Sequence, residues 1–167
     1  MVGKPPNCLT ETPLFKLAKA AALAAIVLPA TAVIATAAGP NPAFKLRHDN
    51  FEAMGRAMKG IGDELKKPTA NVAVIQKNAA TLAAAAPKVK GYFPKGTGPE
   101  AGVKTEALPA IWQRPADFNA AADRLVGATR NLQVAAATGD LAKIQPAVGA
   151  VGQSCKGCHD NFRKPRG

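Results

Sequence analysis

Five consecutive residues near the end of the 167-residue chain could do chemistry: Cys155-Lys156-Gly157-Cys158-His159. Two thiols three residues apart, followed at once by a histidine, form the attachment pattern of c-type haem, in which the thiols add across the vinyl groups and the histidine binds iron. On a helix, this spacing puts both sulfurs on one face, about 4.5 Å apart along the axis, with the histidine rotated by about 100°. The pattern predicts one covalently attached haem c per chain, bound through Cys155 and Cys158, with His159 as the metal ligand.

Two other uses of the cysteine pair are weaker. A thioredoxin-like redox pair needs a βαβ context and a cysteine at a helix N-terminus, whereas this pair falls at the C-terminal end of an expected helix. A structural zinc site needs a fourth ligand, and His48 is the one remaining histidine. The sequence also yields no Ser-His-Asp set, phosphate loop or pair of catalytic carboxylates, so we do not expect an enzyme.

The composition favours closely packed helices as the elements that position this motif. Apolar residues make up 47% of the chain but aromatic residues only 5%, and much of the apolar share is alanine. Sandwiches and barrels are filled with β-branched and aromatic side chains, so strand-rich folds are excluded. The large apolar share also argues against a wholly disordered basic chain.

Apolar spacing of three and four residues predicts four helices, which form an all-α, antiparallel four-helix bundle. The link between the second and third helices, about Pro87 to Arg114, is rich in glycine and proline, and we expect one long crossover loop without secondary structure of its own. The expected helices run from after Pro42 to about Leu65, from about Thr69 to Ala86, from near Pro115 to before Gly139, and from the cap Asp140 to Phe162.

The first 37 residues have the pattern of an export signal. Lysines stand at the head of an apolar stretch from Leu17 to Ala38, which closes on the small residues Ala35-Thr36-Ala37. This ending fits the A-x-A cleavage rule, and Pro29 together with the abundance of alanine makes a poor membrane span. We expect cleavage of residues 1–37 and a mature haem domain, residues 38–167, in the periplasm of a Gram-negative bacterium.

Two alternatives to this processing stay open. The stretch from Ala20 to Ala38 approaches the thickness of a bilayer and could remain as an uncleaved anchor. A translation start downstream of Met1 would explain the unusually long segment before the apolar stretch. Cleavage removes three lysines and Glu11, so the net charge falls from +11 to +9.

With the bundle and the motif in place, the chain resembles the class II c-type cytochromes, and within them the cytochrome c-prime family. The resemblance rests on residues 148–163, VGAVGQSCKGCHDNFR, and is supported by Leu108-Pro109-Ala110-Ile111-Trp112 and by Arg47 and Met54 on the first helix. It covers the whole mature chain. It implies that the two cysteines of the motif bind haem, that His159 is the proximal ligand, and that a homodimer forms through the first two helices.

The resemblance also bears on the opposite, distal side of the iron. In this family the sixth position is open and covered by an apolar side chain of the first helix, and the matching residue is Phe51. In low-spin relatives a methionine from that helix binds iron, and Arg47 stands in its place. The resemblance therefore implies a five-coordinate, high-spin iron. The alternative is a low-spin electron carrier with Met54 or Met58 as the sixth ligand, although a methionine on a helical stripe is more often core filler.

Three further side chains are candidates for contact with the haem. Arg47 lies on the inner stripe, where an unpaired charge is costly, and a haem propionate would pair with it; alternatively, it reaches outward to water. The resemblance puts His48 near a propionate, with a role as sixth ligand as the weaker alternative. Arg163, one turn after His159, could stabilise charge on the proximal face or be a solvated cation at the helix end.

Two functions follow from an open iron behind a phenyl ring. Such a site suits small neutral diatomics, with nitric oxide and carbon monoxide as the expected ligands. Electron transfer is the other expected role, since a net charge of +9 would attract an acidic redox partner. Nucleic acid is excluded as a partner because an exported protein meets none and because only Trp112 and Tyr92 add large stacking surfaces to the phenylalanines.

Overall fold

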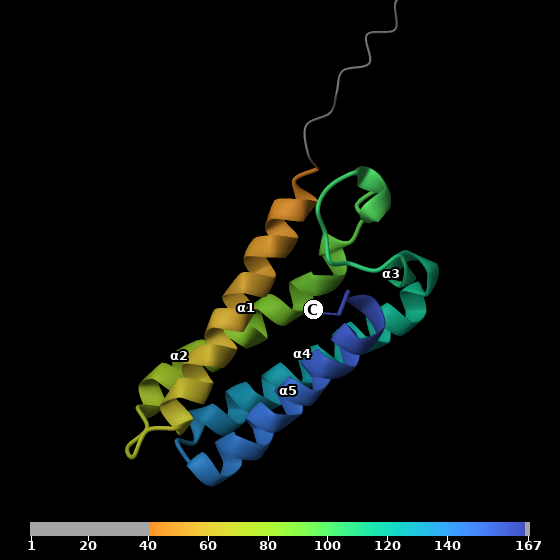
Figure 1. The fold of residues 1–167 in the computed structure, drawn as a ribbon. Coiled ribbons are helices and arrows are strands. Elements are labelled where there is room, and N and C mark those ends of the chain that lie inside the picture. Colours follow the sequence, from red (N-terminus) through yellow and green to blue (C-terminus); the bar gives the residue numbers. More distant parts are fainter. Residues whose placement is uncertain (1–40, 166–167) are drawn as a thin grey trace, which may run out of the picture. The chain divides into compact units, whose positions relative to one another are not determined.

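The computed structural model describes residues 41–165, which belong to one compact unit, Ala37–Gly167. Within these residues the architecture is helical, and four long helices lie side by side (Figure 1). No helix among residues 41–165 has the length and apolar character that crossing a membrane would require. The expected signal segment, residues 1–37, lies outside the described residues.

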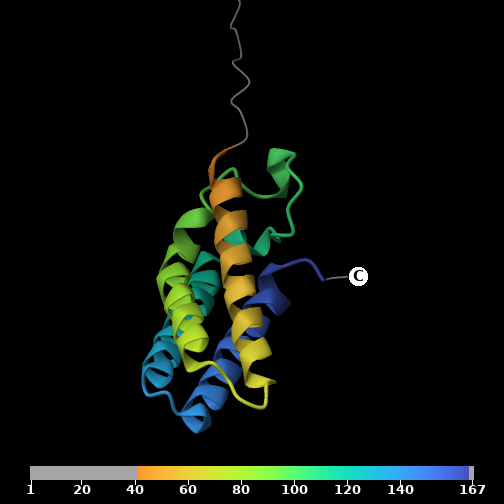
Figure 2. The same ribbon diagram turned by 90° about the vertical axis from the view of Figure 1, so that its left-hand side faces the viewer.

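The long helices confirm the predicted antiparallel four-helix bundle, as two perpendicular views show (Figures 1 and 2). A long loop joins the second and third of them, also as predicted, and it covers the end of the bundle at which the first helix begins (Figure 1). The helices are α1 (Ala43–Leu65), α2 (Val72–Ala85), the single turn α3 (Ala110–Gln113), α4 (Pro115–Ala137) and α5 (Leu141–Phe162).

Side-chain caps set the starts of two helices. The Asp140 carboxylate accepts a hydrogen bond from the backbone N–H of Ala142 at 2.9 Å, as expected for the residue before α5. The Asn71 side chain does the same for Ala73 at 3.1 Å. Because Asn71 supplies this cap, α2 begins at Val72, slightly later than the apolar spacing predicts.

The expectation that the link carries no secondary structure is wrong. Two 3-10 helices, η1 (Ala86–Tyr92) and η2 (Pro99–Ala101), and the turn α3 lie within it. Contacts from distant residues hold the link in shape. The indole N–H of Trp112 donates to the backbone carbonyls of Phe93 and Pro94 at 3.1 and 3.0 Å, which ties the beginning of the link to its end. Local apolar spacing cannot reveal contacts of this kind.

The helices pack as two pairs joined along one side. α1 packs on α2, α4 packs on α5, and α2 packs on α4, whereas α1 and α5 make no comparable packing within the described residues. The facing sides of α1 and α5 are therefore not buried against each other. The core lies among the packed pairs, and its largest fully buried side chains are Ile61, Ile75, Leu82, Leu132, Ile144, Val89 and Val151, with Thr97 and Thr129.

Candidate haem site

The two cysteines of the attachment motif lie in the last two turns of α5, and both are half-buried free thiols. Burial raises the pKa of the Cys155 thiol. Burial also raises the pKa of Cys158, and the neighbouring Cys155 adds to that increase. A catalytic redox pair needs the opposite, a thiol whose pKa is depressed, so the local environment argues against that alternative.

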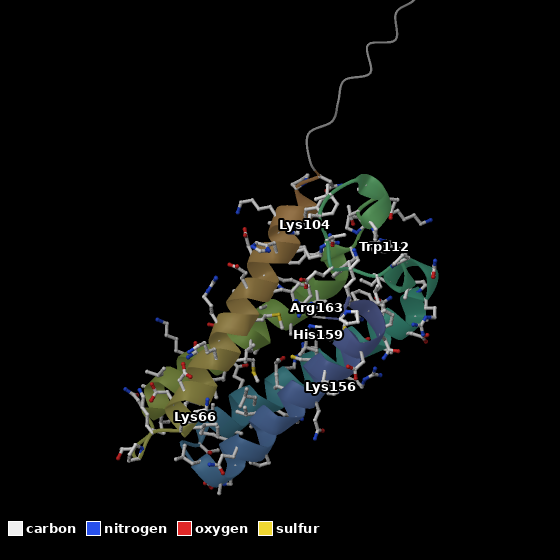
Figure 3. The ribbon with its side chains drawn as sticks, viewed as in Figure 1. Lys66, Lys104, Trp112, Lys156, His159 and Arg163 are labelled. Carbon is white, nitrogen blue, oxygen red and sulfur yellow. The ribbon has the colours of Figure 1, made fainter. Side chains whose placement is uncertain are left out.

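His159 follows the cysteines in the last turn of α5, on the side of the helix that faces α1 (Figure 3). The residue is exposed and borders a shallow hollow that Arg163 and Lys164 also line. Its backbone carbonyl accepts a hydrogen bond from the N–H of Arg163 at 3.1 Å. Within residues 41–165, no three His, Cys, Asp or Glu side chains gather as a metal-binding group, so the zinc alternative lacks its ligand set.

The distal candidates lie on α1 and differ in their surroundings. Phe51 is half-buried, and its ring meets that of Phe93 edge-on with 6.2 Å between the centroids. Met54 is only 5% exposed, and its sulfur accepts a hydrogen bond from the Asn50 amide at 3.6 Å. Met54 thus belongs to the hydrophobic core, while Met58 is partly buried at the edge of that core.

These residues fit a bound haem. Phe51 and Met58 on α1, and Cys155 and Cys158 on α5, are apolar or weakly polar side chains that the core covers only in part. They belong to two helices that hardly pack on each other. A flat apolar group between the helices would bury these side chains, with two thiols available for attachment and a histidine in the next position of the same turn.

Arg47 is buried, with 7% of its surface exposed, which confirms its expected place on the inner stripe and contradicts the alternative that it reaches outward. Both terminal nitrogens of its guanidinium donate to the carbonyl of Thr97 at 3.2 Å. The guanidinium also lies over the rings of Phe44 and Phe93, at 4.8 and 4.7 Å from their centroids. Burial lowers the pKa of Arg47. Its expected contact with a propionate stays a prediction.

His48 is the neighbour of Arg47 on α1 but lies on the solvent side of the helix. Its side chain is 69% exposed, and its Nε2 lies 3.4 Å from a carboxylate oxygen of Glu52. When protonated, His48 therefore forms an exposed ion pair one turn along the helix. Its expected contact with a propionate also stays a prediction.

Arg163 is paired, so it is not the solvated cation of the alternative interpretation. Its Nε donates to a carboxylate oxygen of Glu106 at 2.6 Å, and its Nη2 contacts the same oxygen. The Arg163 side chain is 26% exposed, against 59% for Glu106. Figure 3 shows Arg163 beside His159 at the end of α5. A role of Arg163 on the proximal face stays a prediction.

Sequence reasoning missed three residues that hold the surroundings of the site. Phe93 contacts both Phe51 and Arg47, Thr97 supplies the carbonyl that Arg47 binds, and Glu106 binds Arg163. All three lie in the link and carry no local periodic signal. The sequence offered one hint only, since a buried Arg47 needs an acceptor from another part of the chain.

A sequence profile of the family described as Cytochrome C' matches residues 42–163. Over 69 residues the chain is 49% identical to the cytochrome c' of Rubrivivax gelatinosus, an alignment that covers 41% of this chain and 54% of that protein. An alignment of 144 residues with the cytochrome c' of Rhodospirillum rubrum has 36% identity and covers 86% of this chain and 94% of that protein.

Solved structures agree with these alignments. The crystal structure of cytochrome c' from Thermochromatium tepidum matches with a TM-score of 0.71 and 28% identity, over 77% of this chain and 98% of that one. A nitric oxide complex of a point mutant of the Alcaligenes xylosoxidans cytochrome c' matches with a TM-score of 0.66 and 29% identity, over 76% and 97%. A cytochrome c' with ligand-controlled dimer dissociation matches with a TM-score of 0.68 and 32% identity, over 77% and 100%. Profile, alignments and fold agree across the domain that carries the motif, and the chain belongs to the cytochrome c' family.

Proposed function

We propose that this haem protein carries one haem c, attached through Cys155 and Cys158 and ligated by His159, and that it binds small diatomic gases at a five-coordinate iron. The observation that carries the proposal is the attachment motif at the end of α5, with both thiols half-buried on a helix that hardly packs against α1 opposite. Bound haem supplies an iron that takes up a diatomic ligand or an electron. The nitric oxide complex of a relative favours the gas-binding role.

Two residues of α1 support the proposal of an open distal side. The Met54 sulfur is buried and engaged by the Asn50 amide, so α1 does not offer it toward α5 without repacking the core. Phe51 stands at the partly covered edge of the same helix, where a ring can screen a ligand without bonding to it. A phenyl screen selects by size and polarity, which suits nitric oxide and carbon monoxide.

Electron transfer is the second candidate function, and the charge of the chain favours it. After loss of residues 1–37 the net charge is +9, enough to attract an acidic redox partner over a distance set by the ionic strength. We also propose export to the periplasm, from the signal-like pattern of residues 1–37. N-terminal sequencing of soluble protein should give a start near Ala38, whereas full-length protein confined to membranes would contradict export by cleavage.

We also propose a homodimer formed through α1 and α2. The relative with ligand-controlled dimer dissociation favours this assembly and suggests that it responds to ligand binding. Sedimentation of the mature protein with and without carbon monoxide tests the proposal. A monomer under both conditions at micromolar concentration would contradict it.

The covalent bond is the decisive test of the proposed function. Mature protein denatured in acidified acetone should keep one haem per chain in the polypeptide fraction. The double variant Cys155→Ala, Cys158→Ala should lose that haem entirely, and Ser154→Ala, beside the motif, is the matched control that should keep it. A colourless wild-type protein with stoichiometric zinc would overturn the proposal.

A further inference from the structure

A short piece of the link runs beside the end of α5, and we call this piece, Thr105–Leu108, the strap. The N–H of Leu108 donates to the carbonyl of Phe162 at 3.0 Å, and the N–H of Lys164 donates to the carbonyl of Glu106 at 2.8 Å. Between these two bonds, Ala107 and Arg163 form an isolated antiparallel bridge. The strap thus supplies a donor to the Phe162 carbonyl, one of the carbonyls that lack a helical partner where α5 ends.

The side chains of Glu106 and Arg163 fasten this pairing. Two nitrogens of the guanidinium meet one carboxylate oxygen, a charge-assisted contact with little freedom of orientation. A partly exposed ion pair contributes only about 1 kcal/mol or less to global stability. Its effect is therefore local, because it holds together two segments that the backbone bonds already align.

The fastened segment continues directly into the turn that carries His159. The N–H of Arg163 donates to the His159 carbonyl at 3.1 Å, so the residue that Glu106 binds also completes the last helical hydrogen bond of α5. Phe162 between them is 5% exposed, and its ring packs edge-on against that of Phe118 at 5.5 Å. Loosening Arg163 would free the turn on the side of His159 while leaving the buried ring of Phe162 in place.

The other end of the strap is tied to α1. The hydroxyl oxygen of Thr105 accepts from Nη2 of Arg47 at 3.4 Å and from the N–H of Ala107 at 3.2 Å. A continuous set of polar contacts therefore leads from Arg47 on α1, through the strap, to Arg163 on α5. These are the two helices that hardly pack on each other and that face the site.

We propose that Glu106 is a positioning residue for His159: by holding Arg163 it keeps the strap along the last turn of α5 and fixes the orientation in which the histidine meets the haem iron. The inference rests on the proposed function, since it assumes a haem bound through His159. Without the Glu106 carboxylate, the last turn opens more often, and the imidazole samples several orientations.

The test uses the mature, haem-bearing protein and the variants Glu106→Ala and Glu106→Gln. Hydrogen exchange of the Leu108 and Lys164 amides reports the strap, and the iron–histidine stretching band of the ferrous protein, measured by resonance Raman spectroscopy, reports the imidazole. Asp123→Asn is the matched control, because it removes the ion pair of Lys90 and Asp123 at 2.6 Å, which also joins two elements.

Glu106→Ala should give exchange that is faster by up to about fivefold at both amides, the change expected when local opening loses an ion pair's stabilisation. The iron–histidine band of Glu106→Ala should broaden and shift. The melting temperature of this variant should stay as close to that of wild type as the melting temperature of Asp123→Asn does. Glu106→Gln, which keeps an acceptor oxygen at the same reach but loses the charge, should restore both signals in part.

Faster exchange with an unchanged iron–histidine band would reduce the strap to a structural feature and overturn the positioning role. Unchanged exchange in Glu106→Ala would overturn the strap itself. A wild-type protein without covalent haem would instead overturn the proposed function, and haem content is measured before either variant is compared.

Discussion

The guanidinium of Arg47 lies 4.7 Å from the centre of the Phe93 ring, although the two residues belong to different segments, α1 and the link. The same guanidinium donates to the carbonyl of Thr97, whose side chain is fully buried. One cation thereby joins an aromatic ring and a backbone acceptor from the link to the first turns of α1. This contact gives the link a fixed shape that its glycine- and proline-rich sequence does not suggest.

The first prediction concerns the stability that this contact provides. Arg47→Met should lower the free energy of unfolding by about 1–3 kcal/mol, because the Thr97 carbonyl loses a charged donor and the Phe93 ring loses its cation, while the desolvation cost of the charge is relieved. Urea denaturation measures the change. Arg56→Met is the control on the same helix: Arg56 forms only an exposed pair with Glu52, and its loss should cost about 0.5 kcal/mol or less. Equal effects of the two substitutions would contradict the assigned role of Arg47.

The second prediction concerns the thiols before haem is attached. Burial raises the pKa of Cys155 and Cys158, so at any given pH the folded chain holds less thiolate than the unfolded chain. Alkylation by iodoacetamide at pH 8.5, mapped by mass spectrometry on haem-free mature protein, should be slower than in the same chain unfolded in urea. Because burial raises the folded pKa of both thiols, they contribute stability to the folded state that is present below the unfolded thiol pKa. This stability is lost as the pH rises through the folded pKa. Faster alkylation in the folded state would point back to a redox-active pair.

The third prediction concerns acid stability at the turn between α1 and α2. Oε1 of Glu64 lies 2.6 Å from Lys67 Nζ, and its Oε2 accepts from the N–H of Asn71 at 3.0 Å. The Lys67 contact lowers the pKa of Glu64 most, and the Asn71 bond adds to this. A lowered folded pKa gives stability that is present above the unfolded glutamate pKa and is lost as the pH falls through the folded value.

Glu64→Gln should therefore lower the melting temperature at neutral pH by a few degrees and flatten its fall between about pH 5 and pH 3. Thermal melts at several pH values measure both effects. Asp63→Asn is the neighbouring control, since Asp63 pairs with Lys59 at 2.6 Å on an exposed surface and should change the melting temperature little. If the melting temperatures of Glu64→Gln and wild type fall in parallel with pH, Glu64 is not the source of the acid dependence of stability.

Local signals account for the elements that sequence reasoning predicted. The four long helices repeat apolar residues every three or four positions, and caps such as Asp140 mark where a helix begins. The attachment motif is equally local, because its chemistry is contained in five adjacent residues of α5. Features of this kind depend on near neighbours in the chain, so the sequence is enough to find them.

The parts that escaped prediction depend on contacts between distant residues. Arg47 binds Thr97 across 50 positions, and Arg163 binds Glu106 across 57. The sequence pattern of one segment does not identify the residue that it contacts in the other, because many arginines and glutamates in the chain could form the same hydrogen bonds. The turns of the link are stabilised by such contacts, which is why a glycine- and proline-rich stretch that looks unstructured holds a defined conformation.

The last prediction concerns the open side of the iron. Phe51 is half-buried on α1, whereas Met54 is buried and hydrogen-bonded through its sulfur, so the distal position should contain a phenyl ring and no methionine ligand. Ferric protein at neutral pH should give a high-spin electronic and EPR spectrum, and the ferrous form should bind carbon monoxide without losing a protein ligand. Phe51→Ala should speed that binding by about tenfold, which corresponds to a barrier lowered by about 1.4 kcal/mol, because removing the ring opens distal volume.

Met54→Leu is the control on the same helix, because a swap that conserves volume in the core is mild and should leave both the spin state and the binding rate unchanged. Stopped-flow mixing with carbon monoxide compares the two variants with wild type. A low-spin ferric spectrum in wild type that becomes high-spin in Met54→Leu or Met58→Leu would contradict the open site. In that case a methionine of α1 is the sixth ligand and electron transfer replaces gas binding as the function. If Met54 is that ligand, the hydrogen bond from Asn50 to its sulfur must also break when haem is bound.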